Sequence, residues 1–175
     1  MSRSKRNQLL NNKIIDIFME FVPGGSLKFI LNNFVKFKEK LVRSYTMQIL
    51  EGLKTLHDNG IWHGDLKVCN LLIDDLGIIK ITDFSFIKQV LLNTSKFGDL
   101  KAFMDQGLID NDEFEKLNSP MWGSENYTAP EVIRDPSSKI SAANDIWALG
   151  CIVVEMLTGK EPWHELEGNS ESILK

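Results

Sequence analysis

Apolar residues spaced as on one face of a helix, together with a longer apolar run, predict two long helices. In residues 38–59 they recur every three or four positions, at Leu41, Tyr45, Ile49, Leu53 and Leu56. Gly60 follows as a residue suited to a left-handed helix end. Residues 141–158 are apolar on nearly every side and stop at Gly159. This second segment is typical of a helix buried on most of its surface.

Shorter apolar runs predict strands and a hairpin. Residues 14–22 end at a Pro-Gly-Gly turn, and we expect a buried strand there. Ser26 then begins a short helix as its N-cap. Residues 71–73 and 78–81 flank a turn that contains glycine, which predicts a hairpin. Residues 88–121 have only a weak helical pattern and are predicted to form a long loop. The expected fold class is therefore α+β.

Composition narrows the class of protein. The chain has 175 residues, of which 43% are hydrophobic and 25% charged, enough to bury one ordinary core. A formal net charge of -4 gives no general attraction to nucleic acid or to an anionic lipid surface. No segment has the ~18 consecutive apolar residues that a membrane helix needs. We therefore expect no nucleic-acid partner and no membrane partner.

Cysteine and histidine usage indicates a reducing compartment and no zinc. Cys69 and Cys151 lie in apolar stretches without paired spacing, which predicts buried free thiols and a cytoplasmic or nuclear location. The three histidines, His57, His63 and His164, show no metal-ligand spacing with each other or with the cysteines. We expect no zinc site.

Side chains suited to catalysis gather between the first long helix and the hairpin. Residues 63–70 are HGDLKVCN, and residues 83–85 are DFS. These two strings resemble the catalytic loop H-R-D-L-K-x-x-N and the D-F-G motif of protein kinases, in the family's order and spacing. Residues 123–131 (GSENYTAPE) and 145–150 (DIWALG) are similar to the end of a kinase activation segment and to the helix after it. Four ordered matches are not explained by coincidence.

Two further strings indicate which group of protein kinases the chain most resembles. Residues 18–27 (FMEFVPGGSL) and 155–160 (EMLTGK) most resemble the MAP kinase kinase kinase group, and Lys67 resembles the serine/threonine kinases. Residues 1–13 form a basic and polar segment, and the resemblance implies a partial kinase domain at 14–175. That domain is expected to be the mainly α-helical C-terminal lobe of the kinase fold, with one hinge strand, a short β-hairpin and an activation segment at 83–131.

The resemblance also implies a function. The chain is expected to be a protein serine/threonine kinase of a signalling cascade, which transfers the γ-phosphate of ATP to a protein substrate with the help of Mg²⁺. Asp65 would accept the proton of the substrate hydroxyl, and Lys67 would balance charge on the transferred phosphate. Asn70 and Asp83 would supply oxygen ligands to Mg²⁺. In isolation each of these residues is typical of a turn or a solvated loop; the shared motif favours the functional interpretation.

Other matched positions concern nucleotide binding and the packing around the catalytic loop. Around the adenine of ATP the resemblance places Met19, Glu20, Val22 and Leu72, with the backbone of Glu20 and Val22 as hydrogen-bonding groups; a buried strand is the alternative interpretation. An unpaired carboxylate at Asp145, in a buried helix, would be costly, and the resemblance implies that it accepts backbone N–H bonds from the catalytic loop. His63, Phe84 and Trp147 are expected to be packing residues, and Glu131 a buried carboxylate without a cation.

Several features depart from the kinase pattern. No G-x-G-x-x-G string occurs, and only 17 residues precede Phe18, so the ATP-covering lobe is expected to be absent. Gly64 stands where the family has arginine, and Ser85 where D-F-G has its glycine. These departures leave two alternatives open. One is a pseudokinase or scaffold that binds a regulatory protein partner, and the other is a truncated product without a stable fold.

Overall fold

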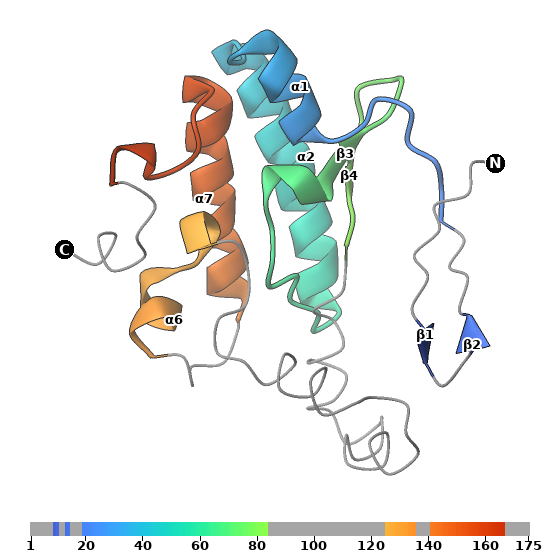
Figure 1. Ribbon diagram of the computed structural model, residues 1–175, viewed down its shortest axis with the longest axis vertical. Helices are drawn as coiled ribbons and strands as arrows, with labels where there is room; N and C mark the ends of the chain where they lie inside the picture. Colours follow the sequence, from blue (N-terminus) through green and yellow to red (C-terminus); the bar gives the residue numbers. More distant parts are fainter. Residues whose placement is uncertain (1–8, 11–12, 15–18, 84–124, 136–140, 167–175) are drawn as a thin grey trace.

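The structure, a computed structural model, describes residues 9–10, 13–14, 19–83, 125–135 and 141–166. In chain order its elements include helices α1 (Leu27–Phe34) and α2 (Glu39–Asp58), the 3-10 turn η1 (Val68–Asn70), and strands β3 (Leu71–Ile73) and β4 (Ile79–Ile81). The 3-10 turn η3 (Glu125–Tyr127), helices α6 (Pro130–Arg134) and α7 (Ala142–Thr158), and the 3-10 turn η4 (His164–Leu166) follow. Figure 1 shows α2 and α7 side by side, with the β3–β4 hairpin against α2. The predicted α+β class is confirmed.

Helices α1 and α2 form where the polar and apolar pattern predicts them. Ser26 caps α1, since its hydroxyl accepts the N–H of Phe29 at 3.2 Å. Helix α2 turns its buried residues inward at Val42, Tyr45, Ile49 and Leu53. Leu41, which the sequence pattern assigned to this face, is 38% exposed. The prediction was wrong at Leu41 because the buried face of α2 runs through Val42 and the three residues after it in that set, and Leu41 lies beside this face.

Strands β3 and β4 form the predicted hairpin, in antiparallel register with Leu71 opposite Ile81. Its turn is closed by Asp74, whose Oδ1 accepts the N–H groups of Leu76 at 2.9 Å and Ile78 at 2.8 Å. The hairpin is attached to α2 through Gln48, whose Oε1 accepts the N–H of Ile79 at 2.8 Å. Strand β4 is thereby held in place just before residue 83.

Helix α7 begins and ends where predicted, but less of its surface is buried than we expected. Ser141 and Asn144 form a capping box at its start, and Gly159 ends it with a left-handed φ of 74°. We expected α7 to be buried on most of its sides. This prediction is wrong for one stripe of the helix, since Ile146, Val154 and Leu157 are 42% to 50% exposed. In the described part of the chain, the core lies against the opposite face of the helix.

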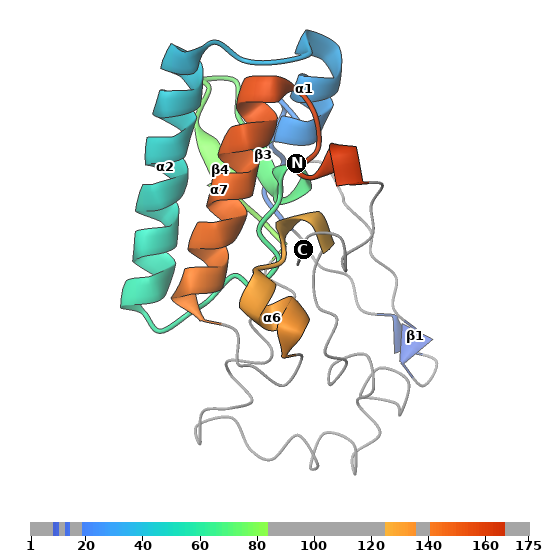
Figure 2. The ribbon, with the colours of Figure 1, turned by 90° about the vertical axis from the view of Figure 1, so that its left-hand side faces the viewer.

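That core joins the helices to the loop between α2 and η1. Figure 2 shows α2 and α7 running alongside each other, and their facing side chains are completely or almost completely buried, among them Ile49, Leu53, Ile152 and Met156. Leu66 and Val68 of the loop belong to the same core and are each 1% exposed. The loop is therefore anchored by its own apolar side chains. None of the described helices has the length and apolar character needed to cross a membrane.

The strand predicted at residues 14–22 is wrong for residues 19–22, whereas Ile14, at the start of that range, does lie in a strand. Residues 19–22 have no strand hydrogen bonding, and Met19 and Phe21 are 59% and 62% exposed. The strands described before them are β1 (Leu9–Leu10) and β2 (Lys13–Ile14), which pair with each other. A strand becomes buried only when neighbouring strands pair with it and cover it, and among the described residues no strand pairs with residues 19–22.

The two thiols also differ from expectation. Cys151 is buried in α7, as predicted, but Cys69 is exposed. The reason is the alternation of the loop around it, in which Leu66 and Val68 point into the core and the residues between and after them point outward. The predicted loop at 88–121, as well as Phe84 and Ser85, lies outside the described residues.

Candidate functional site

The loop between α2 and η1 brings Asp65 and Lys67 together. Because Leu66 and Val68 are drawn into the core, the side chains of Asp65 and Lys67 project to the other side, and they remain 10% and 23% exposed. The ammonium of Lys67 lies 2.8 Å from Oδ2 of Asp65. A carboxylate and an ammonium are therefore held side by side, and both remain partly exposed.

The side-chain amide of Asn70 holds the same loop through hydrogen bonds. Its Nδ2 donates to the backbone oxygen of Asp65 at 2.8 Å and lies 3.4 Å from Oδ2 of that residue. Asn70 is 5% exposed, so this amide is held rigidly. Because Nδ2 serves the loop, the amide oxygen is the group of Asn70 that is left to act as a ligand.

Asp83 is tied to Asn70 through its neighbour Thr82. The N–H of Thr82 donates to the backbone oxygen of Asn70 at 2.9 Å, and the oxygen of Thr82 accepts from Nε2 of His63 at 3.0 Å. Asp83 itself has a left-handed φ of 64°, an uncommon conformation for a residue with a side chain. The residue next to Asp83 is thus hydrogen-bonded to the backbone of Asn70, the other predicted metal ligand.

His63 has a structural position among these residues, as predicted. It is completely buried, and its ring nitrogens have opposite roles. Nε2 donates to the carbonyl of Thr82, whereas Nδ1 accepts the N–H of Asp65 at 3.3 Å. A carbonyl accepts and an N–H donates, so these contacts require the neutral tautomer with its proton on Nε2. His63 joins the strand before Asp83 to the loop that holds Asp65.

Asp145 of α7 holds the loop from inside the core, as predicted. This carboxylate is 1% exposed and accepts the backbone N–H of His63 at 2.9 Å and that of Gly64 at 2.8 Å. The Nε2 of His57 is a third neighbour, 2.7 Å from Oδ2. The sequence interpretation missed His57, because no local pattern relates it to a residue 88 positions later. Gly64 has a φ of 77°, which glycine adopts without strain.

The four residues predicted around the adenine are less tightly grouped. Leu72 of β3 forms a bridge with Ser26, and the N–H of Ile73 donates to the oxygen of Gly25 at 2.9 Å, so the segment after residue 22 is attached to the hairpin. The carboxylate of Glu20 lies 2.7 Å from the ammonium of Lys80 on β4. Val22 is half-buried, whereas Met19 is mostly exposed.

The prediction that Glu131 is buried was wrong. The sequence predicted a buried carboxylate without a cation, but Glu131 is exposed in α6, and its Oε1 lies 3.3 Å from Nδ2 of Asn144. Helix α6 turns Val132 into the core instead, so that the neighbouring carboxylate reaches solvent. No desolvated charge therefore needs compensation at this position.

The side chains of Asn70 and Asp83 have the chemical character of Mg²⁺ ligands. An amide oxygen of Asn70 and the carboxylate of Asp83 are hard oxygen ligands, and Mg²⁺ commonly takes only one or two protein ligands beside waters and phosphates. Larger clusters of His, Cys, Asp and Glu arranged to hold a metal are not found in the described ranges. The donor set agrees with a metal that is bound together with phosphate.

Comparison with known proteins places this geometry in a family. Residues 7–175 match the family model of the protein kinase domain. The MAP kinase kinase kinase mkh1 of Schizosaccharomyces pombe is 44% identical over 149 residues, which are 85% of this chain and 12% of that protein. The mitogen-activated protein kinase kinase kinase ANP1 of Arabidopsis thaliana is 40% identical over 151 residues, 86% of this chain and 20% of its own length.

A third relative agrees with these two. The MAP kinase kinase kinase SSK2 of Saccharomyces cerevisiae is 36% identical over 167 residues, which are 87% of this chain and 10% of that protein. The expected likeness to the MAP kinase kinase kinase group is confirmed by all three names. The chain spans no more than 20% of the length of these curated relatives.

Proposed function

This chain belongs to the protein kinase family, and from that premise we propose that it carries the catalytic loop of a protein serine/threonine kinase. The reaction is transfer of the γ-phosphate of ATP to a serine or threonine hydroxyl of a protein. The observation that carries this proposal is the unit formed by Asp65, Lys67 and Asn70, to which Asp83 is attached through Thr82.

Each residue of the unit has a role that its position supports. Asp65 orients the acceptor hydroxyl and takes its proton, and Lys67 holds Oδ2 of that carboxylate in a fixed orientation 2.8 Å away. The same ammonium is available to stabilise negative charge on the transferred phosphate. Asn70 and Asp83 hold the metal through their oxygens.

ATP supplies the phosphoryl group, and Mg²⁺ neutralises the charge of its phosphates. For the nucleotide base we propose the surface formed by Met19, Glu20, Val22 and Leu72, since the bridge between Ser26 and Leu72 keeps the two segments adjacent. The names of the relatives support a substrate that is itself a member of a MAP kinase cascade.

The decisive experiment compares the full-length protein with its Asp65→Asn variant in a phosphorylation assay with Mg-ATP and a generic protein substrate. Loss of the general base is expected to lower kcat by about 10²-fold or more. Asp58→Asn is the matched control, because Asp58 is an exposed carboxylate of α2 paired with Lys54, and it should retain wild-type activity. Equal signals from wild type and Asp65→Asn, or no signal at all, would favour the scaffold instead.

Nucleotide binding is tested separately by the melting temperature during a titration with Mg-ATP. A ligand that binds only the folded state raises this temperature. We expect a magnesium-dependent rise that Asp83→Asn abolishes. A rise of equal size in both proteins would contradict the assignment of Asp83 to the metal.

A further inference from the structure

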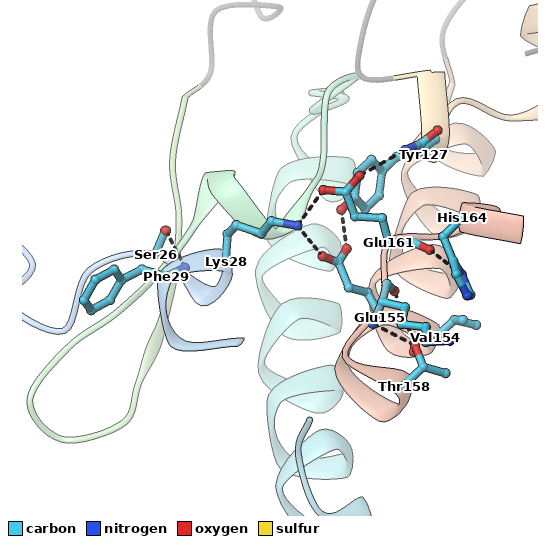
Figure 3. Close-up of polar contacts among 11 residues, drawn as sticks. Ser26, Lys28, Phe29, Tyr127, Val154, Glu155, Thr158, Glu161 and His164 are labelled. Atoms are coloured by element: carbon cyan, nitrogen blue, oxygen red, sulfur yellow. Dashed lines mark hydrogen bonds and ion pairs between the residues drawn. The ribbon is translucent and has the colours of Figure 1, made fainter. Parts of the chain in front are cut away.

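A lysine of α1 lies between two carboxylates of the C-terminal part of the chain. Figure 3 shows Lys28 pointing from α1 toward Glu155 and Glu161. Its ammonium lies 3.0 Å from Oε1 of Glu155 and 2.6 Å from Oε1 of Glu161. Glu155 is 2% exposed, and Glu161 is 53% exposed. One cation thus compensates a buried and a surface carboxylate at once.

The second oxygen of each carboxylate reaches the same 3-10 turn, η3. Oε2 of Glu155 accepts the hydroxyl of Tyr127, and Oε2 of Glu161 lies 3.5 Å from Nδ2 of Asn126. The backbone oxygen of Asn126 also accepts Nε1 of Trp163 at 3.1 Å. The two carboxylates therefore connect Lys28, on one side, with η3 on the other.

The position of Lys28 in its helix gives independent support for these contacts. It is the second residue of α1, whose first turn has no acidic residue. A cation is unfavourable at a helix N-terminus, where the helix dipole is positive. Burial lowers the pKa of Lys28, but hydrogen bonds to Glu161 and Glu155 outweigh that effect, so the net pKa is raised. The carboxylates thus account for a charge that the helix itself disfavours.

Tyr127 connects η3 to the loop that holds Asp65. Its ring packs against the core to which Leu66 and Val68 belong. Its pKa is raised by burial first, then by the hydrogen bond to Glu155 and by the charges of Glu155, Glu161 and Cys69. Because Tyr127 and the loop that carries Asp65 and Lys67 rest on the same core, a displacement of η3 can be transmitted to that loop.

We propose that Lys28 is a positioning residue, which holds Glu155 and Glu161 against η3 and so fixes the surface beside Asp65 and Lys67 on which the protein substrate is received. This inference rests on the proposed kinase function. It assigns to α1, which directly follows the proposed nucleotide surface, a role in holding η3 in place. Removing the ammonium leaves Glu155 buried without its cation, and a buried charge that loses its partner reorganises its surroundings.

The test uses the full-length protein with Lys28→Met, which keeps an unbranched side chain but removes the charge. We expect kcat/KM for the protein substrate to fall about tenfold, the effect of one charge-assisted hydrogen bond, while the KM for ATP changes by less than about twofold. Lys28→Arg should restore most of the activity. Lys54→Met is the matched control, since Lys54 forms an exposed pair with Asp58 on α2 and should behave as wild type.

A second measurement is independent of catalysis. Amide hydrogen exchange in peptides that cover residues 125–134 should become faster in Lys28→Met and remain unchanged in Lys54→Met. Unchanged exchange there, or an equal loss of affinity for ATP and for the protein substrate, would overturn the role of Lys28. If the wild type has no kinase activity, the proposed function fails, and the exchange result still decides whether Lys28 holds η3.

Discussion

Oδ2 of Asp145 lies 2.9 Å from the backbone nitrogen of His63, although 82 residues separate the two in the sequence. The same carboxylate accepts the next N–H of the chain, that of Gly64, through its other oxygen. Two consecutive N–H groups directed at one buried carboxylate fix the backbone just before Asp65. The long helix of the core thereby sets the position of the candidate catalytic base.

Asp145→Asn should therefore destabilise the fold. Asparagine keeps the size but replaces one acceptor oxygen by an NH₂ group, which faces a donor in the buried site. We expect the free energy of unfolding to fall by about 3 kcal/mol, as when a buried charge network is broken. Chemical denaturation measures this change. Asp58→Asn, on the surface of α2, should change the free energy by less than about 0.5 kcal/mol, and an equal effect of the two variants would contradict the role of Asp145.

Two glycines of the α7 region should respond to alanine in opposite directions. Gly150 lies inside the helix, where an added Cβ meets nothing within 4 Å. Gly150→Ala should stabilise the protein by about 0.5–1 kcal/mol through its higher helix propensity. Gly159 has a φ of 74°, and its Cβ would lie 1.6 Å from the backbone oxygen of Val35. Gly159→Ala should cost about 2 kcal/mol or more.

Thermal and urea unfolding of both alanine variants decide this prediction. Gly159 approaches Val35 at the place where the end of α7 meets the end of α1. A second contact lies at the same place, because the N–H of Phe37 donates to the oxygen of Met156 at 2.8 Å. If Gly159→Ala were as stable as wild type, the described contact between these two helix ends would be incorrect.

The two cysteines should differ in their reaction with a thiol reagent. Cys69 is exposed, and Cys151 is 6% exposed within α7. One thiol per chain should react rapidly in the native protein, and the second should react at least about 100-fold more slowly, because it waits for local opening. Cys69→Ser should abolish the rapid phase. Two rapid thiols in the wild type would show that Cys151 is not buried in the native protein.

Cys151 should also make stability fall at alkaline pH. Burial raises its pKa from the ordinary value of 9.0 to about 11. Above pH 9 the unfolded chain loses this proton while the native chain keeps it, so the stabilising effect is complete below pH 9 and is lost as pH rises toward 11. The total loss from this group is roughly 2–3 kcal/mol.

Urea denaturation between pH 8 and pH 11 isolates this contribution, when wild type is compared with Cys151→Ala. The variant begins less stable because it loses buried volume, but its stability should decline less steeply with pH. Parallel curves for the two proteins would mean that the thiol ionises equally in both states.

Much of the candidate site was accessible from the sequence because it is local. Asp65, Lys67 and Asn70 lie within six residues, and the alternation of Leu66 and Val68 with Asp65 and Lys67 already indicates that these two charged side chains point away from the core. That alternation was also the signal that predicts exposure of Cys69, and it was missed. The catalytic roles and the binding of ATP and Mg²⁺ stay predictions until the variants described above are measured.

The sequence by itself determined the helices, the hairpin and the string of candidate catalytic residues, because helix periodicity, turn residues and short motifs are properties of neighbouring positions. Only the tertiary structure decided that Val42 and not Leu41 faces the core, that one stripe of α7 is exposed, and that Glu131 reaches solvent. It alone joined Asp145 to His63 and Lys28 to Glu155, pairs separated by 82 and 127 residues. Such contacts depend on how the whole chain packs, because burial and charge pairing are settled between elements and leave no local pattern.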